Sequence, residues 1–153
     1  MRNDFTSKTK DNMAKRVGFL CSNPTCQKLT VGPNSNQVKH SNIGVAAHIT
    51  AASDGGPRIN SELTVDQRKS INNGIWLFQT CSKLIDSDPQ VYTIDILNAW
   101  KTQAEFYANT IFKSRDNNAN KINIGKLMNN MSDLLMEMSV DLTKNPNLRE
   151  FIL

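Results

Sequence analysis

Several features that would assign this chain to a common class are missing from its sequence. No run approaches the roughly 20 consecutive apolar residues that a membrane-spanning helix needs. The first residues are polar and charged, so they lack the apolar stretch of a secretory signal peptide. Cysteine is scarce, and its odd number, 3, does not suit a disulfide framework. These absences predict a cytoplasmic protein without membrane contact, whose thiols are reduced or bound to metal.

Length and charge restrict the class of partner only loosely. The 153 residues suffice for one compact domain with a small appendage. The formal net charge of +4 mildly favours a polyanionic partner such as DNA. We interpret residues 1–16 as a basic flexible arm or a frayed helix, either solvated or in contact with phosphates. Its basic residues are Arg2, Lys8, Lys10, Lys15 and Arg16.

The spacing of the cysteines favours a metal site. Cys21 and Cys26 flank an Asn-Pro pair that forces a tight turn, and Cys81 follows far along the chain near the start of a predicted helix. Two thiols from such a knuckle and a third from a helix suit structural zinc. However, Phe78 stands where a Cys-x-x-Cys pair would supply the fourth ligand. Three free cysteines acting as small core residues are the alternative, and the sequence leaves both open.

Short strands and helices alternate between residues 17 and 113, which predicts one small α+β domain. Strands are expected at 43–49 and 74–78, and a short helix at 79–86. Thr64 with Gln67 resembles a capping box for a helix through Ser70, and Thr93 is the expected cap of a longer helix. The apolar positions of that longer helix, expected to pack on the core, are Ile96, Leu97, Trp100, Ala104, Tyr107, Ala108 and Ile111.

A second helical segment is predicted at 121–153, after a polar linker. Its apolar residues form a narrow stripe close to a coiled-coil pattern: Ile124, Leu127, Met131, Leu134, Met138 and Leu142. We expect this stripe to dock on a partner protein or on a second copy of the chain. The apolar end, Phe151-Ile152-Leu153, predicts docking of that end or continuation into a larger effector protein.

Four segments, taken in order, resemble the HNH endonuclease family. They are Cys21 to Cys26, Ala46-Ala47-His48-Ile49, Gly55-Gly56-Pro57-Arg58, and Asn73-Gly74-Ile75-Trp76-Leu77-Phe78-Gln79-Thr80-Cys81 with Leu84-Ile85-Asp86. The resemblance covers residue 17 to about residue 88. It implies a small ββα-metal core with a cysteine knuckle, followed by C-terminal helices, and it implies metal-dependent hydrolysis of DNA phosphodiester bonds.

The resemblance also implies catalytic roles. His48 matches the general base that activates water, and Asn73 matches the asparagine that orients this histidine and fixes its tautomer. The catalytic cation would be Mg²⁺ or Mn²⁺. Asp86, one helical turn after Ser82, is its candidate ligand, although a plain surface aspartate is the alternative.

Three basic residues are candidate contacts to the DNA backbone. Arg58 follows two glycines that would let the backbone approach a phosphate, which its planar guanidinium could grip. Arg68 and Lys69 lie on the next predicted helix, where solvated charge is the alternative.

The sequence departs from the family pattern at the metal-binding positions. Ala47 replaces an acidic ligand of the cation, and Ser82 replaces the last histidine of the motif. Two functions follow as alternatives: an HNH-like endonuclease, or a catalytically degenerate module of the same fold that binds DNA or a protein.

Overall fold

The computed structural model describes residues 2–114 of the chain. Met1–Phe112 form one compact unit of short helices and two small antiparallel sheets, which confirms the predicted α+β class. The helix predicted at 121–153 and most of the linker before it lie outside the described residues.

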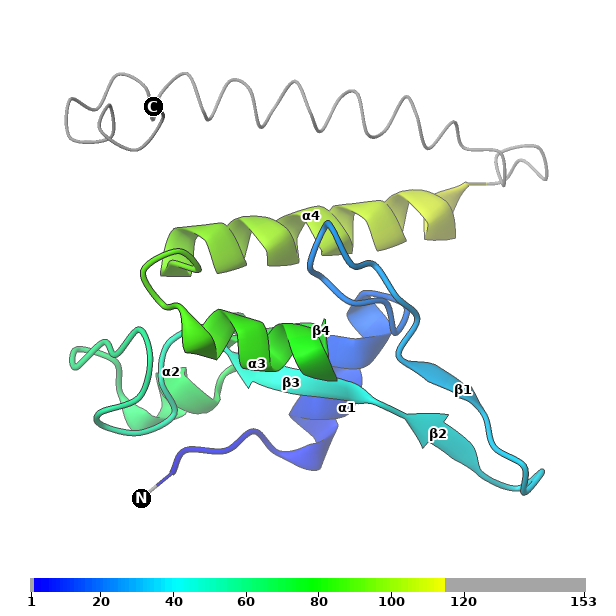
Figure 1. Cartoon of the computed structure of the whole chain (residues 1–153), viewed down its shortest axis with the longest axis horizontal. Helices are drawn as coiled ribbons and strands as arrows, with labels where there is room; N and C mark the ends of the chain where they lie inside the picture. The colour runs from blue at the N-terminus through cyan, green and yellow to red at the C-terminus, as the bar shows by residue number, and fades with distance from the viewer. Residues whose placement is uncertain (1, 115–153) are drawn as a thin grey trace. The chain divides into compact units, whose positions relative to one another are not determined.

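The centre of the unit is a strand–strand–helix arrangement (Figure 1). Strand β3 (Gly44–His48) pairs antiparallel with β4 (Gly74–Phe78), and helix α3 (Gln79–Ser87) follows β4 directly. These elements match the predicted strands and helix within two residues at every end. The register runs from the Gly44–Phe78 pair at one end of the sheet to the His48–Gly74 pair at the other.

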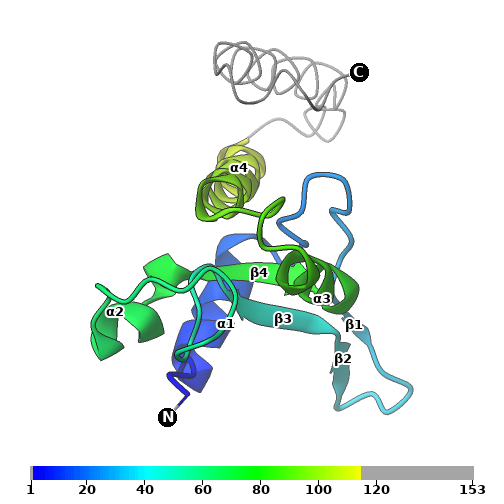
Figure 2. The ribbon, with the colours of Figure 1, turned by 60° about the vertical axis from the view of Figure 1, so that its left-hand side comes forward.

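The two faces of this sheet bury different sets of side chains, because successive strand residues point to opposite faces. One face packs against α3 and α4 (Ile94–Lys113) and holds the main core. That core consists of Cys21, Ala47, Ile49, Ile75, Leu77, Cys81, Ile85 and Leu97. The other face packs against α1 (Ser7–Arg16), as Figures 1 and 2 show, and holds Phe5, Met13, Ala14, Val17 and Trp76.

Of the two alternatives for residues 1–16, the flexible arm is wrong and a helix is present, although this helix is packed against the sheet and not frayed. Helix α1 begins after Thr6, whose side-chain oxygen accepts a hydrogen bond from Thr9 N at 3.1 Å. Met13 is only 3% exposed because it packs onto Gly74, where an added Cβ would lie 2.1 Å from the Met13 methyl group. The few apolar residues among these charges give no clear period, so the sequence pattern did not reveal the buried side of the helix.

Other helix boundaries follow local capping signals. The capping box of Thr64 and Gln67 is present at the start of α2 (Val65–Lys69), as predicted. A 3₁₀ turn, η1 (Ile71–Asn73), leads from α2 into β4. Thr93 caps α4 by accepting a hydrogen bond from the backbone N–H three residues later. None of the described helices is both long enough and apolar enough to cross a membrane.

The predicted packing of α4 on the core is correct for only part of the helix. Leu97 is fully buried, and Trp100 and Ala104 pack against the two core clusters. Two of the predicted positions are exposed instead, Ile96 by 38% and Ile111 by 40%.

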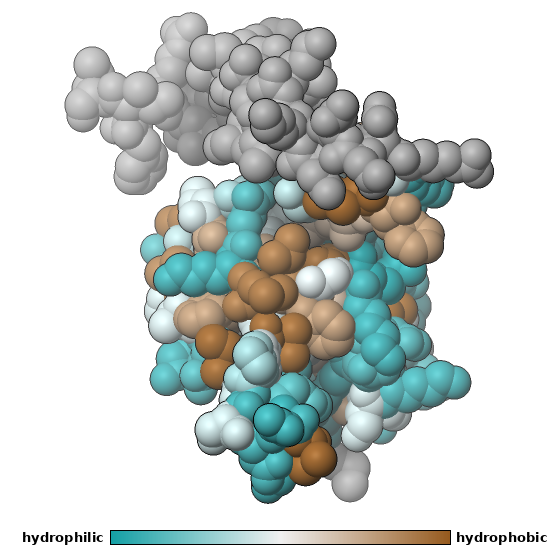
Figure 3. Space-filling model, turned by 90° about the vertical axis from the view of Figure 1, so that its right-hand side faces the viewer, coloured by the Kyte–Doolittle hydropathy of each residue, from teal (hydrophilic) through white to brown (hydrophobic). Residues whose placement is uncertain are grey.

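A separate hairpin, β1 (Val31–Pro33) with β2 (His40–Asn42), projects from the body of the unit. Figure 3 views the molecule from that side and shows apolar side chains interspersed with polar ones. Val38 in the hairpin loop is 89% exposed, so this hairpin contributes little to the core.

Candidate functional site

The candidate residues fall into two groups at opposite ends of the β3–β4 sheet. Phe78, at one end, donates its backbone N–H to the sulfur of Cys21 at 3.1 Å. His48 pairs with Gly74 at the other end. Four residue steps along a strand span about 13 Å, so the cysteines and His48 form separate sites.

The three cysteines meet as predicted. The sulfur atoms of Cys21, Cys26 and Cys81 all lie within 4.8 Å of one another and could hold a metal ion. Cys21 and Cys81 are buried, whereas Cys26 is partly exposed. No other histidine, cysteine, aspartate or glutamate within the described range 2–114 joins this group.

The knuckle geometry follows from its sequence. The side-chain oxygen of Asn23 accepts hydrogen bonds from the backbone N–H and the hydroxyl of Thr25, as is typical of an asparagine-initiated turn. The backbone of Cys26 then donates to the carbonyl of Asn23 at 2.9 Å. Gln27 adopts a left-handed conformation with φ of 48°, which completes the reversal and sets Cys26 beside Cys21.

The surroundings of the sulfurs suit thiolate ligands. The Cys21 sulfur accepts the Phe78 N–H, and the Cys81 sulfur accepts a hydrogen bond from the Asn23 amide at 3.4 Å. Such donors stabilise anionic sulfur more than neutral thiol. The donor set therefore fits a thiophilic cation, with three ligands from the chain.

Burial controls the protonation of these thiols when no cation is bound. It raises the pKa of Cys21 to about 12, and it also raises the pKa of Cys81. Burial acts in the same direction on Cys26, but hydrogen bonds with the Lys28 backbone and the other two thiols outweigh it, so the pKa of Cys26 is lowered. Metal binding would therefore release protons from Cys21 and Cys81.

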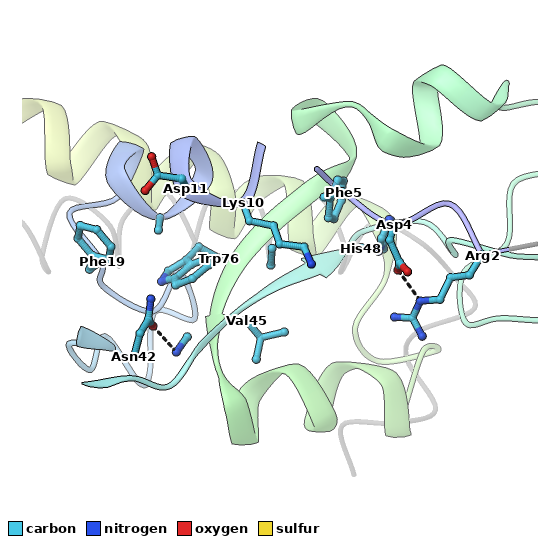
Figure 4. A pocket seen from close by; sticks show the side chains of 13 residues that line it. Arg2, Asp4, Phe5, Lys10, Asp11, Phe19, Asn42, Val45, His48 and Trp76 are labelled. Atoms are coloured by element: carbon cyan, nitrogen blue, oxygen red, sulfur yellow. Dashed lines mark hydrogen bonds and ion pairs between the residues drawn. The ribbon is translucent and has the colours of Figure 1, made fainter. Parts of the chain in front are cut away.

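The ring of His48 is fixed by the N-terminal segment (Figure 4). It stacks on Phe5, with ring centroids 3.9 Å apart and 11° between the planes. Its Nε2 lies 3.0 Å from the backbone oxygen of Asn3. A carbonyl oxygen only accepts, so Nε2 carries the proton in the neutral ring and Nδ1 keeps a lone pair. Burial lowers the pKa of His48 below its ordinary value of 6.5, so the ring is neutral at pH 7.

The predicted orienting role of Asn73 is not borne out by its contacts. The side chain of Asn73 accepts from the backbone N–H and the hydroxyl of Thr50, and it donates to the carbonyls of Thr50 and Arg68. All of its amide contacts therefore hold the loop between β3 and β4. The backbone of Asn3, and not Asn73, fixes the tautomer of His48.

The prediction that Arg58 contacts phosphate is also contradicted. Its side chain is only 3% exposed and donates to the carbonyls of Ile49 and Ile85 at 2.7 and 2.6 Å. The same guanidinium donates to the carboxylate of Asp86 at 2.6 Å. Arg58 thus ties the loop to α3 and is not available to a backbone phosphate.

The other predicted contacts differ in exposure. The side chain of Arg68 is 11% exposed and pairs with Asp54 at 3.2 Å, so it serves mainly the loop. Lys69 is exposed and remains available to a partner.

A cavity of about 500 Å³ opens beside His48 between the N-terminal segment and β3 (Figure 4). Its charged lining consists of Arg2, Asp4, Lys10 and Asp11, of which Arg2 and Asp4 form an ion pair at 2.7 Å. Sequence reasoning missed the role of Asn3 and Phe5 here, because both lie in a segment without periodicity. The only signal was Phe5, an isolated aromatic residue among charged neighbours.

No protein-family model matches the chain, and no curated protein sequence matches it.

Proposed function

We propose that this chain contains an HNH-like domain that binds DNA and has lost the catalytic cation site of that family, while its cysteine cluster holds structural zinc. The observation that carries the proposal is the ion pair of Arg58 and Asp86. It occupies the one carboxylate that the sequence offered as a ligand for Mg²⁺ or Mn²⁺.

The class is supported by the order of elements. Two antiparallel strands separated by a long loop lead directly into α3, with His48 at the end of the first strand and Asn73 just before the second. The cysteine cluster lies beside the end of the second strand. This arrangement agrees with the ββα-metal scaffold that the sequence resemblance implies.

The loss of the cation site is supported by three positions. Ala47 is buried in the core against α3 and has no ligand atom, and Ser82 offers only a hydroxyl. Mg²⁺ is usually bound by carboxylates. Asp86 would have to exchange a charge-assisted hydrogen bond with a buried guanidinium for such an ion.

Contact with DNA is supported by exposed cations on the N-terminal segment and on α2. Arg2 and Lys10 line the cavity, where Asp4 and Asp11 offset part of their charge, and Lys69 is exposed on α2. Three cations can contribute a strongly salt-dependent affinity for phosphates, without sequence preference.

A metal-dependent endonuclease is the second candidate, and the state of His48 favours it. The ring is neutral, and its Nδ1 keeps a lone pair while Nε2 is held by Asn3. A neutral imidazole of this kind can accept a proton from water.

Cleavage of supercoiled plasmid, with Mg²⁺ or Mn²⁺ added, separates the two candidates. We expect DNA to be retarded by the protein in a salt-dependent manner, without nicking that a chelator abolishes. Lys10→Ala should weaken retardation, and Lys39→Ala, in the distant hairpin loop, serves as the matched control. Chelator-sensitive nicking that is lost in His48→Ala would instead establish the endonuclease, and a folded protein that neither retards nor nicks DNA would contradict both.

A further inference from the structure

The cysteine cluster provides three ligands, and the chain has no cysteine left to complete a fourth. The sequence contains 3 cysteines and 2 histidines in total. His40 is in strand β2, His48 lies at the other end of the β3–β4 sheet, and neither belongs to the cluster. Zinc in proteins is almost always four-coordinate, and three protein ligands are typical of sites that bind an exchangeable molecule.

Solvent reaches the cluster on the side of Cys26, the only one of the three thiols that is partly exposed. Phe78 is adjacent, since its backbone contacts the sulfur of Cys21. Its ring cannot coordinate metal, and Phe78, like Cys26, packs against the main core. The amino group of Lys28 lies 5.4 Å from the centre of this ring. The accessible side of the site therefore combines an apolar ring with a positive charge.

The nearby Lys28 and the softness of sulfur donors favour an anionic ligand at the remaining position, against the net charge of the centre. Three thiolates on Zn²⁺ give a net charge of −1, and an anionic fourth ligand would make the net charge −2. The Lys28 ammonium, 5.4 Å from the centre of the Phe78 ring, offsets part of that charge. A soft donor such as a thiolate suits a zinc site already made of sulfur.

We propose that Cys21, Cys26 and Cys81 bind Zn²⁺ through three thiolates and leave the fourth position, beside Phe78 and Lys28, to an exchangeable small ligand, with anionic donors such as thiolate or azide replacing water. This inference rests on the zinc-binding part of the proposed function and is independent of DNA binding. It makes the cluster a ligand-binding site in addition to a structural one.

Cobalt substitution of the full chain tests the inference, because the visible spectrum of Co²⁺ reports its ligands directly. We expect one Co²⁺ per chain and a saturable spectral shift on titration with mercaptoethanol or with azide. Phe78→Cys restores a Cys-x-x-Cys pair, so its spectrum should already indicate four sulfur ligands and should not respond to either titrant. Phe78→Leu, which removes the ring without adding a ligand, is the matched control and should respond like the wild type.

The outcomes distinguish the two levels of the argument. A chain that binds one Co²⁺ but shows no shift with either titrant has its fourth position filled by one of its own groups, which overturns the inference and leaves zinc binding intact. A chain that binds no Co²⁺ and no Zn²⁺ by native mass spectrometry overturns both the inference and the proposed zinc binding.

Lys28→Ala should weaken azide binding by up to about fivefold, the factor that 1 kcal/mol produces. The affinity for uncharged imidazole should change less.

Discussion

Arg58, in the loop after β3, and Asp86, on α3, form an ion pair with 2.6 Å between Nη2 and Oδ1. The side chain of Arg58 is 3% exposed and that of Asp86 is 51% exposed, so the contact extends from the interior to the surface. Arg58 also donates to the backbone carbonyls of Ile49 and Ile85. Arg58, which the sequence suggested as a phosphate contact, therefore connects the loop after β3 to α3 inside the protein.

Replacing Arg58 with lysine should lower the free energy of unfolding by about 2 to 4 kcal/mol, because one ammonium cannot satisfy two carbonyls and a carboxylate in the positions of a guanidinium. Lysine leaves the left-handed backbone requirement unchanged, since φ is 55° there. Urea unfolding measures the change. Asp86→Asn should cost about 1 kcal/mol or less, because that carboxylate is half exposed. Equal losses of unfolding free energy in the two variants would contradict this structural role of Arg58.

Asn73→Asp should lower the free energy of unfolding by at least about 2 kcal/mol. The change replaces an amide N–H group that donates to the carbonyls of Thr50 and Arg68 with an oxygen that faces them. Asn72→Asp makes the same chemical change one residue earlier on an exposed side chain, where we expect a change within about 0.5 kcal/mol. Thermal unfolding of both variants tests the prediction, and similar melting temperatures would count against it.

Gly44→Ala should destabilise the sheet, because a Cβ would lie 2.1 Å from Cζ2 of Trp76. The indole cannot move freely, since its Nε1 donates to the hydroxyl of Thr30 at 3.0 Å. We expect a loss of about 1 to 3 kcal/mol together with altered tryptophan fluorescence. Gly32→Ala is the control because a Cβ there meets open space. Unchanged fluorescence and stability in Gly44→Ala would mean that Trp76 packs elsewhere in solution.

Stability should fall in mild acid through His48. Its pKa in the folded protein is lowered by burial, so the unfolded chain binds the proton more readily. The contribution of His48 is therefore fully present above about pH 6.5 and is lost as the pH falls toward the folded-state pKa. Urea unfolding at several pH values, for the wild type and for His48→Gln, measures this effect.

His48→Gln removes the titrating ring and keeps an amide that can donate to the Asn3 carbonyl. The difference in unfolding free energy between wild type and His48→Gln should shrink as the pH falls below about 6.5. His40, exposed on β2, is present in both proteins, so its contribution cancels in the difference. A difference that stays constant with pH would rule out the buried, neutral state of His48.

The sequence by itself determined the local elements and the pairing of the knuckle with α3. Capping at Thr64 depends on side chains three residues apart, and the Asn-Pro turn between Cys21 and Cys26 depends on a single short segment. The strand patterns at Gly44–His48 and Gly74–Phe78 are likewise local. Such features are readable because neighbouring residues determine them.

Tertiary structure alone decided what the polar side chains do. Arg58 and Asp86 are 28 positions apart in the chain, and the oxygen that holds His48 belongs to Asn3, 45 positions away. A guanidinium has the same chemistry whether it meets a phosphate or two buried carbonyls, so only the packing of the loop onto α3 selects between them. The burial of α1 was also a tertiary outcome, because Met13 fits where Gly74 has no side chain.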